Sequence, residues 1–529
     1  MLKGLLVIVL LRVVAAMSLA CNCTGRCVVE TTTGKYSGVE DQDGVHFLGI
    51  RYAEPPVDAL RFADPVPFVP DESTLYSATT PPPSCLQYSG VQSEDCLFLN
   101  VFRPKSSMKH EKLPVMVWVH GGSFYLGGIS DPVIDGAKLA NAKNMVIVTI
   151  QYRLGAFGLY DDGTNTNFAI KDALLALKWV KKNIHRFDGD KKRVTLAGQS
   201  SGATLIRGVL SSKKGKGLFN RVISMSDPIG FGFNKRSTSV GVIGAMMANV
   251  TGCSDIACMR GLPAEAILEA QAVVIANGHA TNPAVNYAQP FSPVIDDVLI
   301  KKDFAQYVSD GDLPVKVPLL IGTVADEANA IVESALPTAV PVTYYPFVLQ
   351  QFMSTVRAAL IVASLQFVPN FADPDATRHE AAFVAKLFYW TCAVQRNAVK
   401  FWTKMGQKVY IYEMENGIEY PATAGLTLCG PGYVCHQADL EVLFGTYDVA
   451  SVTSAQIALS AEVQERWYQF ISRGSPNSGQ YVNWKPIQYL LNLNLLKLGQ
   501  EKIVKTLYPS RCNLVFGSVV EYDYQMYSE

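Results

Sequence analysis

The sequence predicts an α/β protein in which helices cover a sheet of buried, parallel strands. The first observation is a set of short, uninterrupted apolar runs, because strands buried on both faces lack alternating polar residues. The second is an amphipathic helix between two of these runs, and strands alternating with helices are typical of this class. The third is composition, since 49% hydrophobic and 17% charged residues in a chain of 529 supply a large core.

Each predicted element follows from its own pattern. Residues 168–184 are expected to form a helix packed on one face, because their apolar positions recur at three and four residues. The segment 334–375 is rich in proline and aromatic residues, and we expect helical covering material there. No flexible linker or fixed repeat interrupts the chain, which favours one domain over residues 21–529. The predicted strands are 113–119, 145–150, 194–197, 222–224, 319–321 and 409–412.

The N-terminal sequence predicts a secretory signal peptide over residues 1–20. Lys3 precedes the apolar run 5–11, and the small-residue site Ser18-Leu19-Ala20 follows. A membrane anchor is the alternative, although Arg12 interrupts a span of near-minimum length, and a bacterial lipobox is a weaker one. No lipid-anchor or retention signal ends the sequence. We therefore expect a secreted, extracellular protein with no stable membrane anchor.

Charge and cysteine usage narrow the class further. Lys and Arg total 46 and Asp and Glu total 46, so a nucleic acid partner is not expected. The eleven cysteines suit an oxidising compartment, and their odd number leaves one thiol without an intramolecular partner. Two sequons, at Asn22 and Asn249, are compatible with glycosylation. Three pairs lie close in sequence: Cys85 and Cys96, Cys253 and Cys258, and Cys429 and Cys435. Cys392 and Cys512 stand alone and could pair with each other. Cys21, Cys23 and Cys27 cluster near the N-terminus.

Two glycine-rich turns point to serine hydrolase chemistry. Gly198-Gln199-Ser200-Ser201-Gly202 follows a β-branched run and precedes a helix start, the setting of a nucleophile elbow. His120-Gly121-Gly122-Ser123-Phe124 follows the run 113–119, and such a loop can aim backbone N–H groups at an oxyanion. Either motif alone is compatible with an ordinary turn. Both together, in this order, favour an active site.

Further strings make the chain similar to one family, the type-B carboxylesterase and cholinesterase-like branch of the α/β hydrolases. The resemblance runs over most of the mature chain and implies the α/β-hydrolase fold, with a large central, mostly parallel sheet flanked by helices. Its most specific string is Ser-Glu-Asp-Cys-Leu at 93–97. The other matching strings are 47–50, 53–56, 98–101, 152–155, 293–296, Gly322 with Asp326-Glu327, and 435–440.

The resemblance also assigns roles to residues. It implies Ser200 as nucleophile, His436 as general base and acid, and Glu327 as the carboxylate that orients the imidazole, in the chain order of α/β hydrolases. Asp326 competes with Glu327 by sequence alone, and a lone histidine is more often structural. The implied oxyanion hole consists of the N–H groups of Gly122, Ser123 and Ser201, with Gly121 shaping the loop.

The family pattern implies disulfides and a structural ion pair as well. The implied disulfides are Cys85 with Cys96, Cys253 with Cys258, and Cys392 with Cys512, while Cys429 with Cys435 would brace the histidine loop. Arg61 and Glu94 match a family salt bridge, for which we expect a structural role.

Several positions depart from the family. Gln199 stands where many members carry an acid, and the short 85–96 loop holds no tryptophan, so acetylcholine is a poor guess for the substrate. Met225 and Asp227 replace the usual Gln and Gly behind the site, and Ala328 replaces a glycine, changes that could distort or retune the triad.

The sequence thus predicts a secreted serine carboxylesterase that acts on a small-molecule ester through an acyl-enzyme. Neither a metal nor an organic cofactor is expected, since no HExxH motif or dinucleotide fingerprint occurs. The alternatives are a catalytically silent adhesion or interaction protein, a lipase, and a scavenging esterase with slow deacylation. The sequence leaves the physiological ester and the oligomeric state open.

Overall fold

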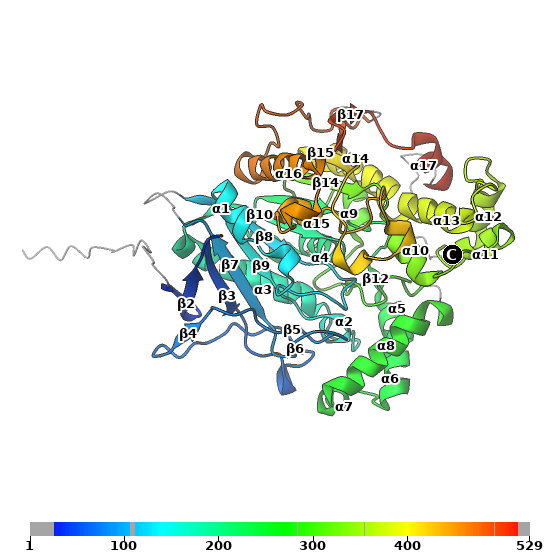
Figure 1. Cartoon of the computed structure of the whole chain (residues 1–529). Helices are drawn as coiled ribbons and strands as arrows, with labels where there is room; N and C mark the ends of the chain where they lie inside the picture. The colour runs from blue at the N-terminus through cyan, green and yellow to red at the C-terminus, as the bar shows by residue number, and fades with distance from the viewer. Residues whose placement is uncertain (1–25, 106–111, 283, 354, 491, 517–529) are drawn as a thin grey trace, which may run out of the picture.

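A twisted sheet passes through the middle of the protein in the computed structural model, which describes residues 26–105, 112–282, 284–353, 355–490 and 492–516 (Figure 1). Thirteen strands of the described residues form it, in the order β1-β2-β3-β7-β9-β8-β10-β11-β14-β15-β16-β17, with β4 beside β2. The strands are β1 (Arg26–Thr31), β2 (Gly34–Glu40), β3 (Val45–Arg51), β4 (Leu75–Ser77), β7 (Phe98–Arg103), β8 (Leu113–Val119), β9 (Val146–Ile150), β10 (Gly189–Gln199), β11 (Arg221–Met225), β14 (Leu319–Val324), β15 (Val409–Met414), β16 (Leu495–Leu498) and β17 (Lys502–Val504).

The central strands are parallel, and the outer pairs are antiparallel except for β2 with β4, which is parallel. From β9 through β8, β10, β11, β14 and β15 to β16, every neighbouring pair is parallel. All seven residues of β8 are buried, as expected for a strand covered on both faces. Five of the six predicted apolar runs lie within these strands, and the sixth, 145–150, begins one residue before β9, so the predicted fold class is confirmed.

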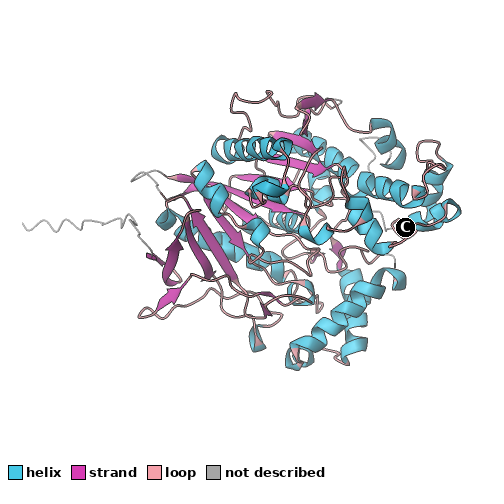
Figure 2. Cartoon of the chain, viewed as in Figure 1, coloured by secondary structure: helices cyan, strands magenta, loops and turns pink. Residues whose placement is uncertain are grey.

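Helices cover both faces of the sheet (Figure 2). Neighbouring residues of a strand point to opposite faces. Val117 of β8 packs into the core on the side of α3 (Phe168–Asn183) and α4 (Ser201–Leu210). Trp118 faces the other side, where its ring lies edge-on to Phe444, with 5.0 Å between the centroids. The helices of that second face are α1 (Ala137–Lys143), α15 (Leu440–Phe444) and α16 (Ser454–Arg473).

Beyond the sheet lies a helical region that includes the segment 334–375 (Figure 1). Helices at residues 345–349 and 355–363 alternate with loops in this segment, and the buried Phe352 between them accepts a hydrogen bond from Tyr389. The remaining helices and short strands are α2 (Gly155–Leu159), α5 (Arg236–Thr238), α6 (Ala245–Thr251), α7 (Ile256–Gly261), α8 (Ala264–Thr281), α9 (Phe304–Asp310), α10 (Asn329–Ala335), α11 (Tyr345–Leu349), α12 (Thr355–Ala363), α13 (Ala376–Lys386), α14 (Cys392–Met405), α17 (Pro509–Phe516), β5 (Ser84–Cys85), β6 (Gln92–Ser93), β12 (Asn234–Lys235) and β13 (Val294–Ile295).

Disulfides tie loops to this framework. The structure joins Cys85 to Cys96, Cys253 to Cys258, Cys392 to Cys512 and Cys429 to Cys435. Cys27 is also disulfide-bonded, while Cys21 and Cys23, like Asn22 and the signal segment 1–20, lie outside the described residues. Asn249 is exposed on α6.

Two further features bear on the architecture. Arg61 and Glu94 form a two-pronged, mostly buried ion pair with both distances at 2.6 Å, which supports the structural role expected for them. Among the helices of the described residues, none has both the length and the apolar character needed to span a membrane.

Candidate active site

Ser200 occupies a strained turn between β10 and α4. β10 ends at Gln199 and α4 begins at Ser201, which leaves Ser200 at φ 57° and ψ −128°. A side chain on Gly202 would come within 2.3 Å of the carbonyl oxygen of Val119, so the turn can pack against β8 only with glycine there. A non-glycine residue at positive φ is costly, and such strain is typical of a nucleophile elbow.

His436 and Glu327 meet beside this turn, although they lie on separate loops. Glu327 Oε2 lies 2.5 Å from His436 Nδ1, and its Oε1 accepts the N–H of Val324 at 2.9 Å. The glutamate is fully buried, so its carboxylate holds one orientation. Nδ1 of His436 therefore carries the proton in the neutral ring, and Nε2 is left as an acceptor.

The neighbouring carboxylate, Asp326, has a different task. Its Oδ2 accepts the N–H of Val434 at 2.8 Å, and its own N–H donates to the carbonyl of Val434 at 2.9 Å. These bonds and the Cys429–Cys435 disulfide fix the loop that carries His436. The structure therefore places Glu327 against the imidazole and Asp326 beneath the loop.

Gln199 makes a contact that the sequence motif alone does not reveal. Its Nε2 lies 3.1 Å from His436 Nε2, so the amide donates to the nitrogen that would receive the proton of Ser200. Oε1 of the same buried amide has no partner among the described atoms. Within the described part of the chain, Ser200 Oγ makes no hydrogen bond to His436 or to any other group. In this arrangement, Gln199 rather than Ser200 donates to Nε2 of His436.

A set of backbone donors faces the same turn. The N–H groups of Gly122, Ser123 and Ser201 donate to no protein acceptor among the residues described. A side chain on Gly121 would come within 3.0 Å of Ser200 Cβ, which shows how closely the loop approaches Ser200. Gly122 has φ 110°, and a Cβ there would lie 2.2 Å from the carbonyl oxygen of Leu126. This arrangement suits stabilisation of an oxyanion.

A buried aromatic cluster of Phe231, Tyr389 and Trp390 reaches His436 through Trp390, and no sequence motif indicated it. The ring centroid of Trp390 lies 5.6 Å from that of His436, and its indole donates to the carbonyl of Ser226 at 3.0 Å. Phe231 stacks on Tyr389 at 3.9 Å. Tyr389 and Trp390 belong to a π-helical turn, Leu387–Thr391, of a kind that often occurs at functional sites. The only available signal was the aromatic string 388–390.

The departures from the family pattern are accommodated locally. Ala328 has φ −97°, so this position does not require glycine. The carbonyl of Met225 accepts the N–H of Ser200 at 3.0 Å. Asp227 forms a buried ion pair with Arg207 of α4, with 3.0 Å between the carboxylate and Nε. This pair ties the helix behind Ser200 to the end of β11.

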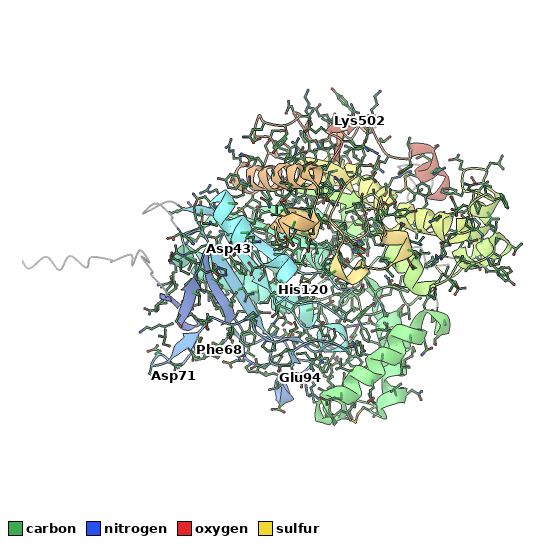
Figure 3. All side chains as sticks on the ribbon, viewed as in Figure 1. Asp43, Phe68, Asp71, Glu94, His120 and Lys502 are labelled. Carbon is green, nitrogen blue, oxygen red and sulfur yellow. A yellow bond between two sulfur atoms is a disulfide. The ribbon has the colours of Figure 1, made fainter. Side chains whose placement is uncertain are left out.

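Two further buried titratable groups, His120 and Asp439, lie near Ser200, Glu327 and His436. Burial lowers the pKa of His120 to about 4; this ring stacks on Tyr152 near the centre of the molecule (Figure 3). His120 is therefore neutral and suited to a structural role. Burial, and secondarily the charge of Glu327, raises the pKa of Asp439 to about 7. Neither oxygen of Asp439 has a partner among the described atoms, which is consistent with a carboxyl that is easily protonated.

The Gln199 contact leads to a first prediction. Gln199→Glu places a carboxylate where the amide now lies 3.1 Å from His436 Nε2, and this charge favours the imidazolium, which cannot act as a base. We expect the lower half-maximal pH of kcat/KM to rise by about one unit. Gln199→Met, which adds no charge, should not raise it. An unchanged profile in Gln199→Glu, measured between pH 5 and 9, would contradict the contact.

Comparisons with known proteins identify a family, relatives and solved structures that are similar to this chain. The sequence model of the carboxylesterase family matches residues 26–515. A para-nitrobenzyl esterase of Bacillus subtilis is 30% identical over 486 residues, which cover 86% of this chain and 92% of that protein. Carboxylesterase 4A of Bos taurus is 30% identical over 492 residues, covering 83% and 84% of the two chains. A solved PNB esterase structure matches with a TM-score of 0.78 and 27% identity, covering 92% of this chain and 99% of the other.

Proposed function

The chain belongs to the carboxylesterase family and is a carboxylic ester hydrolase, and we propose that it works through an acyl-enzyme on Ser200. The observation that carries the proposal is the 2.5 Å contact between Glu327 and His436, two residues 109 positions apart in sequence. A carboxylate at this place holds the imidazole in the tautomer that can accept a proton, and it stabilises the imidazolium.

Acylation would begin when Ser200 displaces the Gln199 amide from His436 Nε2. The hydroxyl oxygen attacks the ester carbonyl carbon while Nε2 takes the hydroxyl proton. The carbonyl oxygen becomes an oxyanion, which the free N–H groups of Gly122, Ser123 and Ser201 can stabilise. When the carbon–oxygen bond to the alcohol breaks, His436 returns the proton to the leaving oxygen. The acyl group remains on Ser200.

Deacylation would repeat these steps with water. His436 Nε2 takes a proton from water as its oxygen attacks the acyl carbon, and a second oxyanion forms at the same donors. The bond to Ser200 breaks, the serine oxygen regains its proton from His436, and the carboxylic acid departs. Every proton in the cycle therefore moves through one nitrogen, Nε2 of His436.

The substrates are small-molecule esters. Phe231, Tyr389 and Trp390 are buried and contact one another, and we propose that they hold the ring of His436 from one side. We further propose that residues 21–529 form one hydrolase domain, released to the extracellular space after removal of residues 1–20. The disulfides are compatible with that route, and exposed Asn249 is the described candidate for glycosylation.

Partition of the acyl group between two nucleophiles tests this mechanism. Butyrate esters of p-nitrophenol, phenol and ethanol would all produce the same butyryl-Ser200. In the presence of hydroxylamine, the ratio of hydroxamate to free butyrate should therefore be identical for the three esters. A ratio that changes with the alcohol would show that no common acyl-enzyme forms. The uncatalysed reaction of each ester with hydroxylamine serves as the control.

A further inference from the structure

A second concave site lies at the opposite end of the helix that follows the nucleophile. α4 begins after Ser200 and ends at Leu210, so its ends are about 15 Å apart. Beyond its C-terminal end opens a cavity of ≈ 990 Å³, a volume at the upper end of those of ligand pockets. Its lining includes none of the proposed catalytic residues and no member of the aromatic cluster beside His436.

The cavity is lined by many more cations than anions. Six lysines and a single carboxylate, Asp312, contribute to the lining, whereas the whole chain has equal numbers of basic and acidic residues. The lysines come from three separate segments: Lys213, Lys214, Lys216, Lys301, Lys302 and Lys316. Cations near the end of α4 also stabilise the helix dipole, but that effect involves the last turn and does not account for lysines from all three segments.

Most of the lysines that line the cavity form no ion pair with a carboxylate among the described residues. Lys302 lies between Asp310 and Asp312 at 2.8 and 2.7 Å, and Lys316 donates to the carbonyl of Gly311 at 2.8 Å. The other four lysines, within the described residues, form no ion pair. Burial raises the pKa of the nearby Asp64 carboxyl, but the hydrogen bond and charge of Lys171 and, least of all, the charge of Lys214 bring it below its usual value.

The segments that carry the lysines are fixed by hydrogen bonds. Asp296 Oδ1 accepts the N–H groups of the turn 298–300, at 2.8 to 3.0 Å, just before Lys301. Ser212 caps the turn of Lys213 and Lys214, accepting the N–H of Lys214 at 3.2 Å. The N–H of Val315 donates to the carbonyl of Leu210 at 3.1 Å and joins the third segment to α4. The cavity therefore has a preorganised frame.

An unpartnered hydroxyl also lines the cavity. Ser211 is 1% exposed, and its Oγ has no hydrogen-bond partner among the described atoms. A buried hydroxyl without a partner is costly unless a ligand or water satisfies it. Phe219, Leu313 and Val315 supply buried apolar surface beside it.

We propose that this cavity binds a compact polyanion that carries several phosphate or sulfate groups. Lysines recognise such oxyanions as point charges, and spreading them over three segments suits a ligand with several charged groups better than a single phosphate ion. The Ser211 hydroxyl provides one neutral hydrogen bond. The site is separate from the ester site, so its occupation does not depend on Ser200.

Calorimetric titration of the full secreted chain tests the proposal with two probes. Inositol hexakisphosphate represents clustered phosphates, and a heparin-derived tetrasaccharide represents clustered sulfates, so the two arms distinguish the source of the anion. We expect saturable 1:1 binding of at least one probe, weakened about tenfold between 50 and 200 mM NaCl because salt screens the lysines. Removing Lys213, Lys214, Lys216 and Lys301 together, each to Ala, should weaken it at least about thirtyfold.

A matched variant controls for the loss of charge alone. Lys35, Lys485, Lys502 and Lys505 are exposed and do not line the cavity; Lys502 lies at the upper edge of Figure 3. Replacing these four by Ala should leave probe affinity within about twofold, and ester hydrolysis by both variants verifies their folding. Equal weakening in both variants, or no saturable binding of either probe, would overturn the proposal. If the protein bound phosphatidylserine vesicles but neither probe, the polyanion proposal would be wrong, and the lysines would instead contact a membrane surface.

Discussion

Ser200→Ala is expected to lower kcat/KM for a short-chain aryl ester by about 10⁵-fold. The variant keeps the backbone N–H donors of Gly122, Ser123 and Ser201, and it keeps the contact between Glu327 and His436. It removes the only atom that would form the acyl bond, so the residual rate should reflect binding and oxyanion stabilisation alone. The assay is paired with intact-mass measurement after treatment with a fluorophosphonate, which should add one adduct to the wild-type protein and none to the variant.

Ser292→Ala is the matched control for this loss. Ser292 is fully buried with an unpartnered hydroxyl, as judged within the described residues, and it belongs to neither the triad nor the oxyanion donors. It should keep both the adduct and turnover. A wild-type adduct without turnover would identify a stoichiometric scavenger, whereas the absence of an adduct on folded protein would contradict the assignment of Ser200.

The sequence predicted the buried centre of the sheet better than its edges. The run 113–119 coincides with β8 because both faces of that strand are covered and every residue is apolar. The prediction 194–197 captured only part of β10, whose first half contains the exposed Lys191 and Lys192. Strands such as β2 were not predicted, because Gly34–Glu40 is polar and is held as a strand by pairing with β1 and β3. Pairing between distant segments leaves no local signal.

The candidate active site, too, could be predicted from sequence only where the signal is local. Local motifs indicated Ser200 and the loop of Gly121 to Ser123, because a turn between a strand and a helix imposes its own residue types. The roles of His436 and Glu327 came from family resemblance, since no spacing in the sequence brings them together. The contact between Gln199 and His436 joins residues 237 positions apart, and the Phe231–Tyr389 stack depends on a π-helical turn. Such contacts are consequences of the completed fold.

Glu327→Gln is expected to lower kcat by about 10⁴-fold while KM changes little. An amide at this place can present its NH₂ group to Nδ1, which would leave the proton on Nε2, the nitrogen that must be free to accept it. The amide also lacks the charge that stabilises the imidazolium. Because the carboxylate of Glu327 is fully buried and bonded to the N–H of Val324, no nearby water can replace it easily.

Asp326→Asn separates this effect from simple damage to the loop. Asp326 uses one oxygen to accept the N–H of Val434, and an asparagine carbonyl can accept the same bond. We expect this variant to keep kcat within about threefold of wild type and to retain the Cys429–Cys435 disulfide in non-reducing peptide maps. The two substitutions are isosteric, adjacent and equal in charge change, so only their positions relative to His436 differ. A large loss in Asp326→Asn with near-normal activity in Glu327→Gln would transfer the orienting role to Asp326.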